Sequence, residues 1–368
     1  MDAINAILEP IMSITWQQCV MILIGGLLVF LAIKFEMEPT LLLPMGFGAI
    51  IVNLPMSGAI GEHGVLTVLN NAGIANELFP LLLFIGIGAM IDFTPLLTNP
   101  KLMFFGAAAQ FGIFFTLCLA SLFFPLNDAA SIGIIGAADG PTAIFVSNEL
   151  GSNLRGPIMV AAYSYMALVP VIQPPVIKLV TTKKERQIRM PYSSKKVSKL
   201  TLILFPIIIT IVAGLVAPDS VALVGFLMFG NLIRACGVLD SLSETAQKVL
   251  ANLVTILLGI SVSTSMKAED FLAPQTLLIL GLGLFAFVFD TVGGVMVAKL
   301  FNLFSKTKIN PMIGAAGISA FPMSARIVNK MGLEEDNQNF LLMHSIGVNV
   351  SGQIASVIAG GLILTMFG

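Results

Sequence analysis

Two short stretches of this sequence share a pattern that decides its fold: residues 135–145 read IGAADGPTAIF, and residues 313–322 read IGAAGISAFP. Each stretch is apolar, yet each is interrupted by Gly and Pro, which end one helix and begin another. The surrounding segments, 129–147 and 310–329, are therefore predicted to be re-entrant hairpins of broken helix, which enter a membrane and return on the same side.

The sequence around these hairpins is too apolar for a water-soluble globule. Of its 368 residues, 57% are hydrophobic and 11% are charged, and the mean hydropathy is +0.96, whereas an ordinary soluble domain is roughly a quarter charged. A membrane helix needs about 20 apolar residues. The chain is predicted to be an all-α polytopic membrane protein, with crossings at 18–34, 40–55, 78–91, 102–125, 156–182, 200–217, 219–235, 248–265, 273–300 and 340–367.

The two halves of the chain match each other when one is shifted by 178 or 179 residues. The shift brings Pro39 onto Pro218 and Asn53 onto Asn231, and it aligns the IGAA of both hairpins. Aligned Pro and Asn are harder to obtain by chance than scattered Leu and Ala. Residues 18–182 and 200–368 are predicted to be two copies of one unit with five crossings and one hairpin. Because five is odd, the second copy is expected to be inverted in the membrane.

The linker between the copies, residues 183–199, sets the expected orientation. It holds seven basic residues and one acid, Glu185, so the positive-inside rule places it in the cytoplasm. When the predicted crossings are followed from this linker toward both ends of the chain, 17 of the 19 basic residues fall on the cytoplasmic side, with Arg155 and Lys267 as exceptions. Both termini are then outside, including an external segment 1–17 that lacks the basic head of a signal peptide. The hairpins enter from opposite sides, so their tips can meet near the midplane.

The first hairpin carries an acid, Asp139, directly before Gly-Pro. One interpretation is a helix N-cap, a role for which Asp is well suited. Ser or Thr would cap without a charge, whereas a charge at the bilayer centre costs about 2.5–3.5 kcal/mol on insertion scales. An ion or proton role for Asp139 is therefore the favoured hypothesis.

The second hairpin offers neutral oxygens and one cation. Asn310 and Ser319, next to broken-helix carbonyls, suit a small hard cation such as Na+, although both could equally be caps. Arg326 follows this hairpin, where it either snorkels to the interface or binds a carboxylate.

Polar residues also lie within three crossings. Tyr163 and Tyr165 follow the first hairpin, and interfacial anchoring is the common explanation for such tyrosines. Asp290 is a second acid in an apolar run, with no visible partner, and its role stays open. Asn349, Ser351 and Gln353 make the last crossing polar, which indicates either the wall of an ion pathway or helix–helix contacts.

Several classes of function are excluded by missing motifs. There is no phosphate-binding loop, so ATP hydrolysis is not proposed, and no His-Glu-x-x-His pair, so zinc proteolysis is not proposed. There is also no Ala-Met-Lys-Met biotin-attachment sequence. The three cysteines have no paired spacing, so neither a disulfide scaffold nor a transition-metal site is expected. A net charge of -1 gives no field that would attract nucleic acid. Transport is therefore expected to draw on an ion gradient or on chemistry presented by another subunit.

Four stretches together resemble a known family: GAADGPTAIF, the YSY crossing, NPMIGAAGISAFPMSAR and the closing GVNVSGQIASVIAGG. They look like the membrane β subunit of biotin-dependent sodium-pumping decarboxylases, over most of the chain and in the expected order. Relatives decarboxylate oxaloacetate, methylmalonyl-CoA, glutaconyl-CoA or malonate. One departure is visible, because residues 347–352 read GVNVSG where GPNVAG is expected.

The resemblance implies a bacterial or archaeal cytoplasmic-membrane subunit that decarboxylates carboxybiotin and exports Na+ with proton uptake. Carboxybiotin would come from a biotin carrier protein, loaded by a carboxyltransferase α subunit, in an oligomeric complex with a small membrane γ or δ subunit; the acyl substrate is chosen elsewhere. The implied catalytic residues are Asp139, Tyr163, Tyr165 and Arg326. The implied Na+ residues are Asp139, Asn310, Gly314, Ser319, Asn349 and Ser351.

Two alternatives remain open at this point. A secondary Na+-coupled carboxylate transporter would use the same inverted repeat and hairpin tips without breaking a bond. A passive membrane scaffold is the weaker alternative, because a scaffold does not need acids and broken helices at the midplane.

Overall fold

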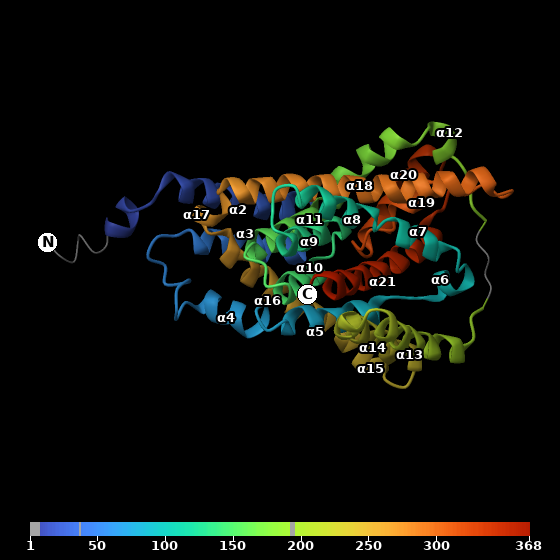
Figure 1. Cartoon of the computed structure of the whole chain (residues 1–368), viewed down its shortest axis with the longest axis horizontal. Helices are drawn as coiled ribbons and strands as arrows, with labels where there is room; N and C mark the ends of the chain where they lie inside the picture. Colours follow the sequence, from blue (N-terminus) through green and yellow to red (C-terminus); the bar gives the residue numbers. More distant parts are fainter. Residues whose placement is uncertain (1–7, 37, 192–195) are drawn as a thin grey trace.

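A computed structural model describes residues 8–36, 38–191 and 196–368, and the regular elements in these ranges are all helical. Most of the long helices run along one axis of the molecule (Figure 1). Helix α4 (Val65–Gly73) lies toward one end of that axis, and α12 (Lys183–Arg186) lies toward the other. The prediction of an all-α polytopic protein is confirmed.

Eight helical spans within the described ranges are long and apolar enough to cross a membrane, or nine if the bent pair α4–α5 counts as one. Six are close to single helices: α2 (Trp16–Phe35), α11 (Arg155–Val180), α13 (Lys199–Val216), α14 (Val221–Cys236), α18 (Pro274–Phe304) and α21 (Leu342–Phe367). Two are composite: one joins α7 (Leu102–Ala108) to α8 (Phe111–Ala120), and the other runs through α15 (Asp240–Glu244), η3 (Thr245–Leu250), α16 (Ala251–Val262) and η4 (Ser263–Met266). These spans match eight of the ten expected crossings.

The other two expected crossings, 40–55 and 78–91, are shorter in the structure. They correspond to α3 (Pro39–Val52) and α5 (Leu78–Met90), of 14 and 13 residues, against the roughly 20 that a full crossing needs. Helix α5 follows α4 at an angle of 62°. Helix α3 ends at Asn53, whose side chain donates to Ala49 O at 2.8 Å. Of these two runs, α5 forms a candidate span together with α4, whereas α3 alone is a shorter apolar helix.

Both segments predicted as hairpins are broken helices. The first consists of α9 (Leu126–Gly133), the 3-10 turn η1 (Ile134–Ala137) and α10 (Gly140–Glu149). The second consists of α19 (Met312–Ala315), a non-helical stretch 316–322, and α20 (Met323–Glu335). The remaining short helices are α6 (Thr94–Thr98), η2 (Pro218–Ser220) and α17 (Ala268–Phe271).

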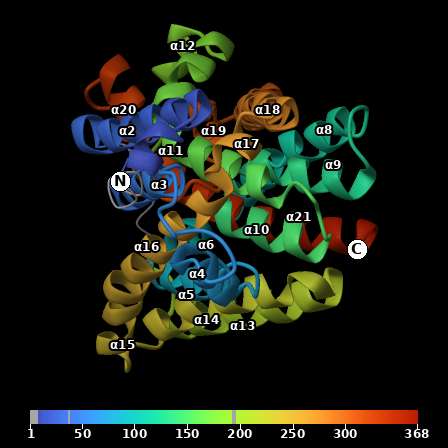
Figure 2. The ribbon, with the colours of Figure 1, turned by 90° about the vertical axis from the view of Figure 1, so that its left-hand side faces the viewer.

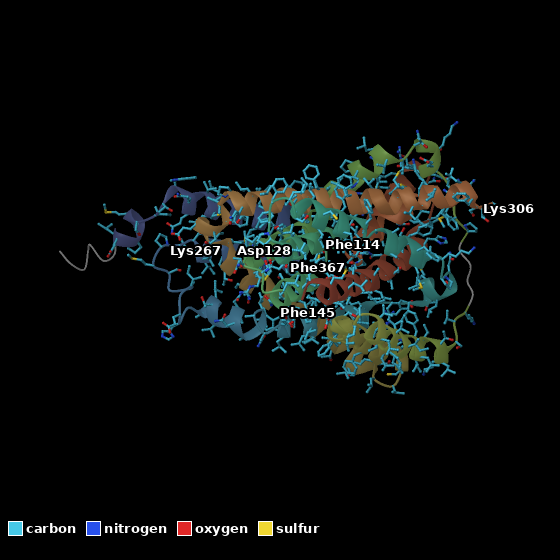
Figure 3. The ribbon with its side chains drawn as sticks, in the orientation of Figure 1. Phe114, Asp128, Phe145, Lys267, Lys306 and Phe367 are labelled. Atoms are coloured by element: carbon cyan, nitrogen blue, oxygen red, sulfur yellow. The ribbon has the colours of Figure 1, made fainter. Side chains whose placement is uncertain are left out.

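The distribution of side chains is that of a protein surrounded by lipid. Helix α13 has 18 residues, of which only Pro206 and Ala213 are buried, and its exposed residues are mostly Leu, Ile and Val. Helices α13, α14 and α15 form one outer layer (Figure 2). Lys267 and Lys306 lie at opposite ends of the long axis, with apolar side chains on the surface between them (Figure 3).

Residues 178 positions apart make matching contacts between the two halves. The amide of Asn53 donates to Met266 O at 2.8 Å, and the amide of Asn231 donates to Gly88 O at 3.3 Å. Both the donors (231 minus 53) and the acceptors (266 minus 88) are separated by 178. Helix α3 packs on α16 just as α5 packs on α14. These contacts agree with the proposed repeat, while inversion of the second copy in the membrane stays a prediction.

Candidate functional site

The first hairpin turns at Asp139, which caps its second helix. Ala138 adopts a left-handed conformation with φ of 51°, which reverses the chain, and Asp139 is extended. Its Oδ1 accepts a hydrogen bond from Thr142 N at 3.3 Å, and Pro141 is compatible with the first turn because that turn needs no proline N–H. The cap expected from the sequence is therefore present, on a side chain that is only 3% exposed.

The second oxygen of Asp139 is held from another part of the chain. Its Oδ2 accepts hydrogen bonds from Gln353 Nε2 at 3.0 Å and from Ser356 Oγ at 2.8 Å, both on α21. A cap alone does not need these contacts, because they engage the oxygen that faces away from α10. Asp139 therefore connects the first hairpin to the last crossing.

No fixed positive charge compensates Asp139. The five ion pairs found in the described ranges do not include it, and its hydrogen-bond donors are all neutral. A buried ionised carboxylate is costly without a partner of opposite charge, whereas a proton or a bound cation removes that cost. The surroundings of Asp139 are therefore suited to an exchangeable positive charge.

The tips of the two hairpins are in contact. Ser319 N donates to Ala137 O at 2.9 Å, two residues before Asp139. The Ser319 hydroxyl donates to Gly352 O on α21 at 3.2 Å. The structure thus brings Ser319, the first hairpin and α21 together.

Two polar residues of the last crossing face different neighbours. Asn349 donates from Nδ2 to Ala316 O at 3.0 Å and to Ile318 O at 2.7 Å, while its buried Oδ1 has no hydrogen-bond partner. Ser351 instead donates to Met103 O on α7 at 3.1 Å. Asn349 therefore lies against the second hairpin with an oxygen to spare, whereas Ser351 joins α21 to α7.

The two tyrosines point to different places. The ring of Tyr163 packs on Gly140, where an added Cβ would lie 2.4 Å from Tyr163 Cε1, and its buried hydroxyl has no hydrogen-bond partner. Tyr165 donates from its hydroxyl to Leu280 O on α18. The structure places Tyr163 beside the residue that follows Asp139 and directs Tyr165 toward α18.

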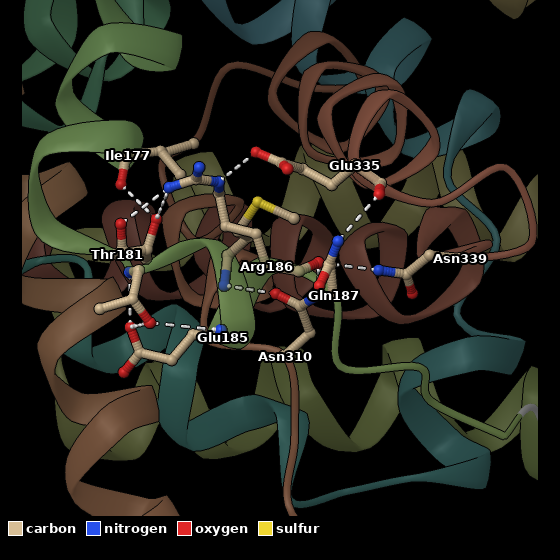
Figure 4. Close-up of polar contacts among 10 residues, drawn as sticks. Ile177, Thr181, Glu185, Arg186, Gln187, Asn310, Glu335 and Asn339 are labelled. Atoms are coloured by element: carbon tan, nitrogen blue, oxygen red, sulfur yellow. Dashed lines mark hydrogen bonds and ion pairs between the residues drawn. The ribbon is translucent and has the colours of Figure 1, made fainter.

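Gly314 and Asn310 serve as contacts of the second hairpin. A Cβ on Gly314 would lie 2.1 Å from Gly294 O, so only glycine allows α19 to approach α18 this closely. The Asn310 amide donates to Arg186 O at 2.7 Å and to Ile188 O at 3.0 Å (Figure 4). The contacts of Asn310 lie with the linker, and the structure gives it no contact with Asp139.

Arg326 lies on α20 and is exposed, outside the five ion pairs of the described ranges. Its charge acts on Glu38, in the turn between α2 and α3. Burial raises the pKa of Glu38, and the positive charge of Arg326 lowers it in part. The structure therefore places the exposed charge of Arg326 within electrostatic range of the turn between α2 and α3.

Sequence reasoning missed Ser356 and did not connect Gln353 with Asp139. Asn349, Gln353 and Ser356 occupy positions i, i+4 and i+7 of one helix, so they share a face. That periodicity could have identified Ser356. The partner that Gln353 and Ser356 share, Asp139, lies more than 200 residues earlier and could not be read from that periodicity.

Gln110 is a second residue that the sequence did not single out. It lies in the break between α7 and α8, and its amide donates to Gly106 O at 3.0 Å and to Gly317 O at 3.3 Å. Its Oε1 is buried and has no hydrogen-bond partner. Gln110 therefore connects the broken crossing to the second hairpin.

Asp290 has a partner that the sequence could not reveal. Its Oδ1 accepts a hydrogen bond from Gly112 N, in the first turn of α8, while its Oδ2 is buried and unpaired. A Cβ on Gly136 of the first hairpin would lie 3.1 Å from that Oδ2. Asp290 therefore caps the broken helix α8 from a different helix, α18.

Comparison with known proteins agrees with this architecture. The family described as "Na+-transporting oxaloacetate decarboxylase beta subunit" matches residues 17–367. The oxaloacetate decarboxylase beta chain of Klebsiella pneumoniae is 45% identical, covering 99% of both chains. The methylmalonyl-CoA decarboxylase beta subunits of Propionigenium modestum and Veillonella parvula are 47% and 48% identical, covering 95% and 96% of this chain and 94% of each relative. The chain belongs to the family of Na+-transporting oxaloacetate decarboxylase beta subunits.

Proposed function

We propose that this protein decarboxylates carboxybiotin and couples the reaction to Na+ export with proton uptake. Its family makes it the membrane subunit of a multisubunit decarboxylase. The observation that carries the proposal is Asp139, a buried carboxylate with only neutral donors, where one hairpin tip and α21 meet. A group of this kind can exchange a proton for a cation without leaving an uncompensated charge.

The chemistry requires a proton, which such an exchange can supply. Decarboxylation breaks the C–N bond of carboxybiotin, the electron pair returns to the ureido nitrogen, CO2 leaves, and the nitrogen gains a proton. In this proposal Asp139 gives up its proton as it takes Na+, so reaction and ion movement share one group. Exporting each Na+ against 100 mV costs about 2.3 kcal/mol.

The proposed Na+ ligands are oxygen atoms around the hairpin tips. Asp139 supplies the charge, and the unpaired Oδ1 of Asn349 and the hydroxyl of Ser319 supply neutral oxygens. Gly314 and Ser351 support this set by holding α18 and α7 close to the second hairpin and α21.

Arg326 and Tyr163 are the proposed contacts with the reacting group. Arg326 would hold the carboxyl group of carboxybiotin from the cytoplasmic side, since a guanidinium offers two parallel donors to a carboxylate. Tyr163 has a free hydroxyl beside the turn that contains Asp139. Arg326→Lys keeps the charge but loses the planar grip, so we expect roughly 100-fold slower CO2 release from an intact complex. Near-normal turnover would show that this grip is not needed.

The proposed partners are a biotin carrier protein, a carboxyltransferase α subunit and a small membrane γ or δ subunit, in the cytoplasmic membrane of a bacterium or archaeon. The relatives are named as beta chains of decarboxylases, which supports an assembly. The proposed topology predicts that an impermeant thiol reagent labels a cysteine introduced at Lys184 only from the cytoplasmic side. Labelling from the outside would show that the topology is the reverse of the proposed one.

Reconstitution tests the proposed function as a whole. The complex in liposomes should release CO2 from carboxylated biotin carrier and move 22Na+ in the same reaction. Na+ movement without CO2 release, driven by a carboxylate gradient, would instead identify a secondary transporter.

A further inference from the structure

The linker between the two halves is bound tightly to the second hairpin. We call residues 181–190 the linker strap (Figure 4). Within it, Arg186 Nε lies 2.6 Å from Glu335 Oε1 at the end of α20, and Arg186 Nη1 donates to Thr181 O at 2.8 Å. The two paired side chains are only 13% and 14% exposed, so water screens this ion pair less than one on an open surface.

Backbone contacts tie both ends of the hairpin to the same peptide. Arg186 O accepts hydrogen bonds from Asn310 Nδ2 at 2.7 Å and from Asn339 Nδ2 at 2.9 Å. Asn310 precedes α19, and Asn339 follows α20. The start and the end of the second hairpin therefore meet on one carbonyl of the linker strap.

Further contacts extend the attachment on either side. Arg189 forms two bonds to Asp336, at 2.5 and 2.9 Å, although its side chain is 57% exposed. Glu185 lies 3.1 Å from Lys299 on α18. The linker strap thus joins the second hairpin to the long helix α18.

We propose that Arg186 and Asn310 are positioning residues for decarboxylation, acting through the linker strap. Arg326 lies on α20, whose far end is held by Arg186, so the strap fixes the helix that carries Arg326. Asn310 Nδ2 donates to two backbone carbonyls of the linker strap, and Asn310 Oδ1 accepts a hydrogen bond from Met312 N at 3.1 Å. Asn310 therefore acts by holding the hairpin rather than by binding Na+. This inference rests on the proposed role of Arg326.

A charge swap tests the buried ion pair. Arg186→Glu and Glu335→Arg should each raise the half-saturating concentration of carboxylated carrier and slow turnover about tenfold, and the double variant should recover most of both losses. Lys184→Glu makes the same charge change at an exposed position of the same segment and should stay near wild type. Wild-type behaviour of the single variants, or a double variant no better than either, would overturn the proposal.

Paired asparagine variants separate holding from ion binding. Asn310→Ala and Asn339→Ala should both speed tryptic cleavage after Lys183 and Lys184, and both should lower turnover while leaving the half-saturating Na+ concentration within about twofold. A large rise in that concentration for Asn310→Ala alone would show that Asn310 binds Na+. The cleavage assay does not depend on decarboxylation, so failure of the proposed function would leave it unaffected, whereas unchanged cleavage would refute the strap itself.

Discussion

Asp139 and Asp290 are both buried carboxylates that accept a hydrogen bond from the first turn of a helix, yet their surroundings differ. Asp139 caps its own helix and lies at a chain break, where α21 contributes two donors. Asp290 lies inside the 31-residue helix α18 and caps a helix on another segment. A break in a helix can absorb the backbone changes of a hinge, whereas a residue inside a continuous helix moves only with the whole helix. On this difference we base the proposal that Asp139 exchanges ions, and we expect Asp290 to support the fold.

The largest expected effect comes from Asp139→Asn. Asn can still cap α10 and nearly matches Asp in shape, but it neither ionises nor releases a proton. We expect at least about 100-fold loss of Na+-stimulated CO2 release in detergent, with normal insertion and assembly. If Na+-dependent turnover survives, Asp290 becomes the acid that exchanges ions.

The stability of Asp290 variants should depend on the shape and acceptor atoms of the new side chain more than on its charge. Asp290→Ala removes the acceptor for the α8 backbone, and a buried donor left without its acceptor costs about 1–3 kcal/mol. Asp290→Asn keeps one carbonyl acceptor, so more assembled complex should survive heating than for Asp290→Ala, as size-exclusion chromatography can measure. Equal losses for both variants would indicate a role for the negative charge.

Ser356→Ala should weaken ion binding without removing the carboxylate. The Ser356 hydroxyl donates to Asp139 Oδ2, and a hydrogen bond to a charged group is worth roughly 10- to 100-fold in binding. We expect the half-saturating Na+ concentration to rise by that factor while the rate at saturating Na+ changes little. Ser345→Ala is the matched control, because Ser345 is also buried on α21 and its hydroxyl has no hydrogen-bond partner in this structure.

Tyr163→Phe should have the smallest effect. Its hydroxyl has no partner in this structure, so removal breaks no existing hydrogen bond. If the hydroxyl contributes one bond during the reaction, turnover should fall about threefold to tenfold. Tyr165→Phe should leave turnover unchanged but lower stability, because it loses the bond to Leu280 O.

Most of the fold could be predicted because apolar length and Gly-Pro punctuation are local signals. The predicted crossings 156–182 and 273–300 correspond to α11 and α18. The shorter α3 was harder to anticipate, because its apolar run extends to Pro55 and the helix ends at Asn53, whose side chain bonds to Met266, 213 residues away.

The candidate site was less predictable because the hydrogen-bond partners of its residues lie far away in the sequence or are backbone groups. Asp139 stood out as an acid beside Gly-Pro, but its donor Ser356 lies 217 residues later. Asp290 pairs with the backbone of Gly112, so no side chain could signal that contact. Asn310 was a candidate ion ligand because its side-chain oxygen lies next to the carbonyls of a broken helix, whereas the backbone carbonyls that its amide group bonds lie in the linker, more than 120 residues earlier.

The most direct test compares Asp139→Asn with Asp290→Asn in liposomes that contain the assembled complex and carboxylated biotin carrier. CO2 release, 22Na+ movement and the pH inside the vesicles are followed together. We predict that Asp290→Asn retains coupled CO2 release and Na+ movement, and that Asp139→Asn loses both. Coupled activity in Asp139→Asn, or its loss in Asp290→Asn at equal assembly, would contradict the assignment of ion exchange to Asp139.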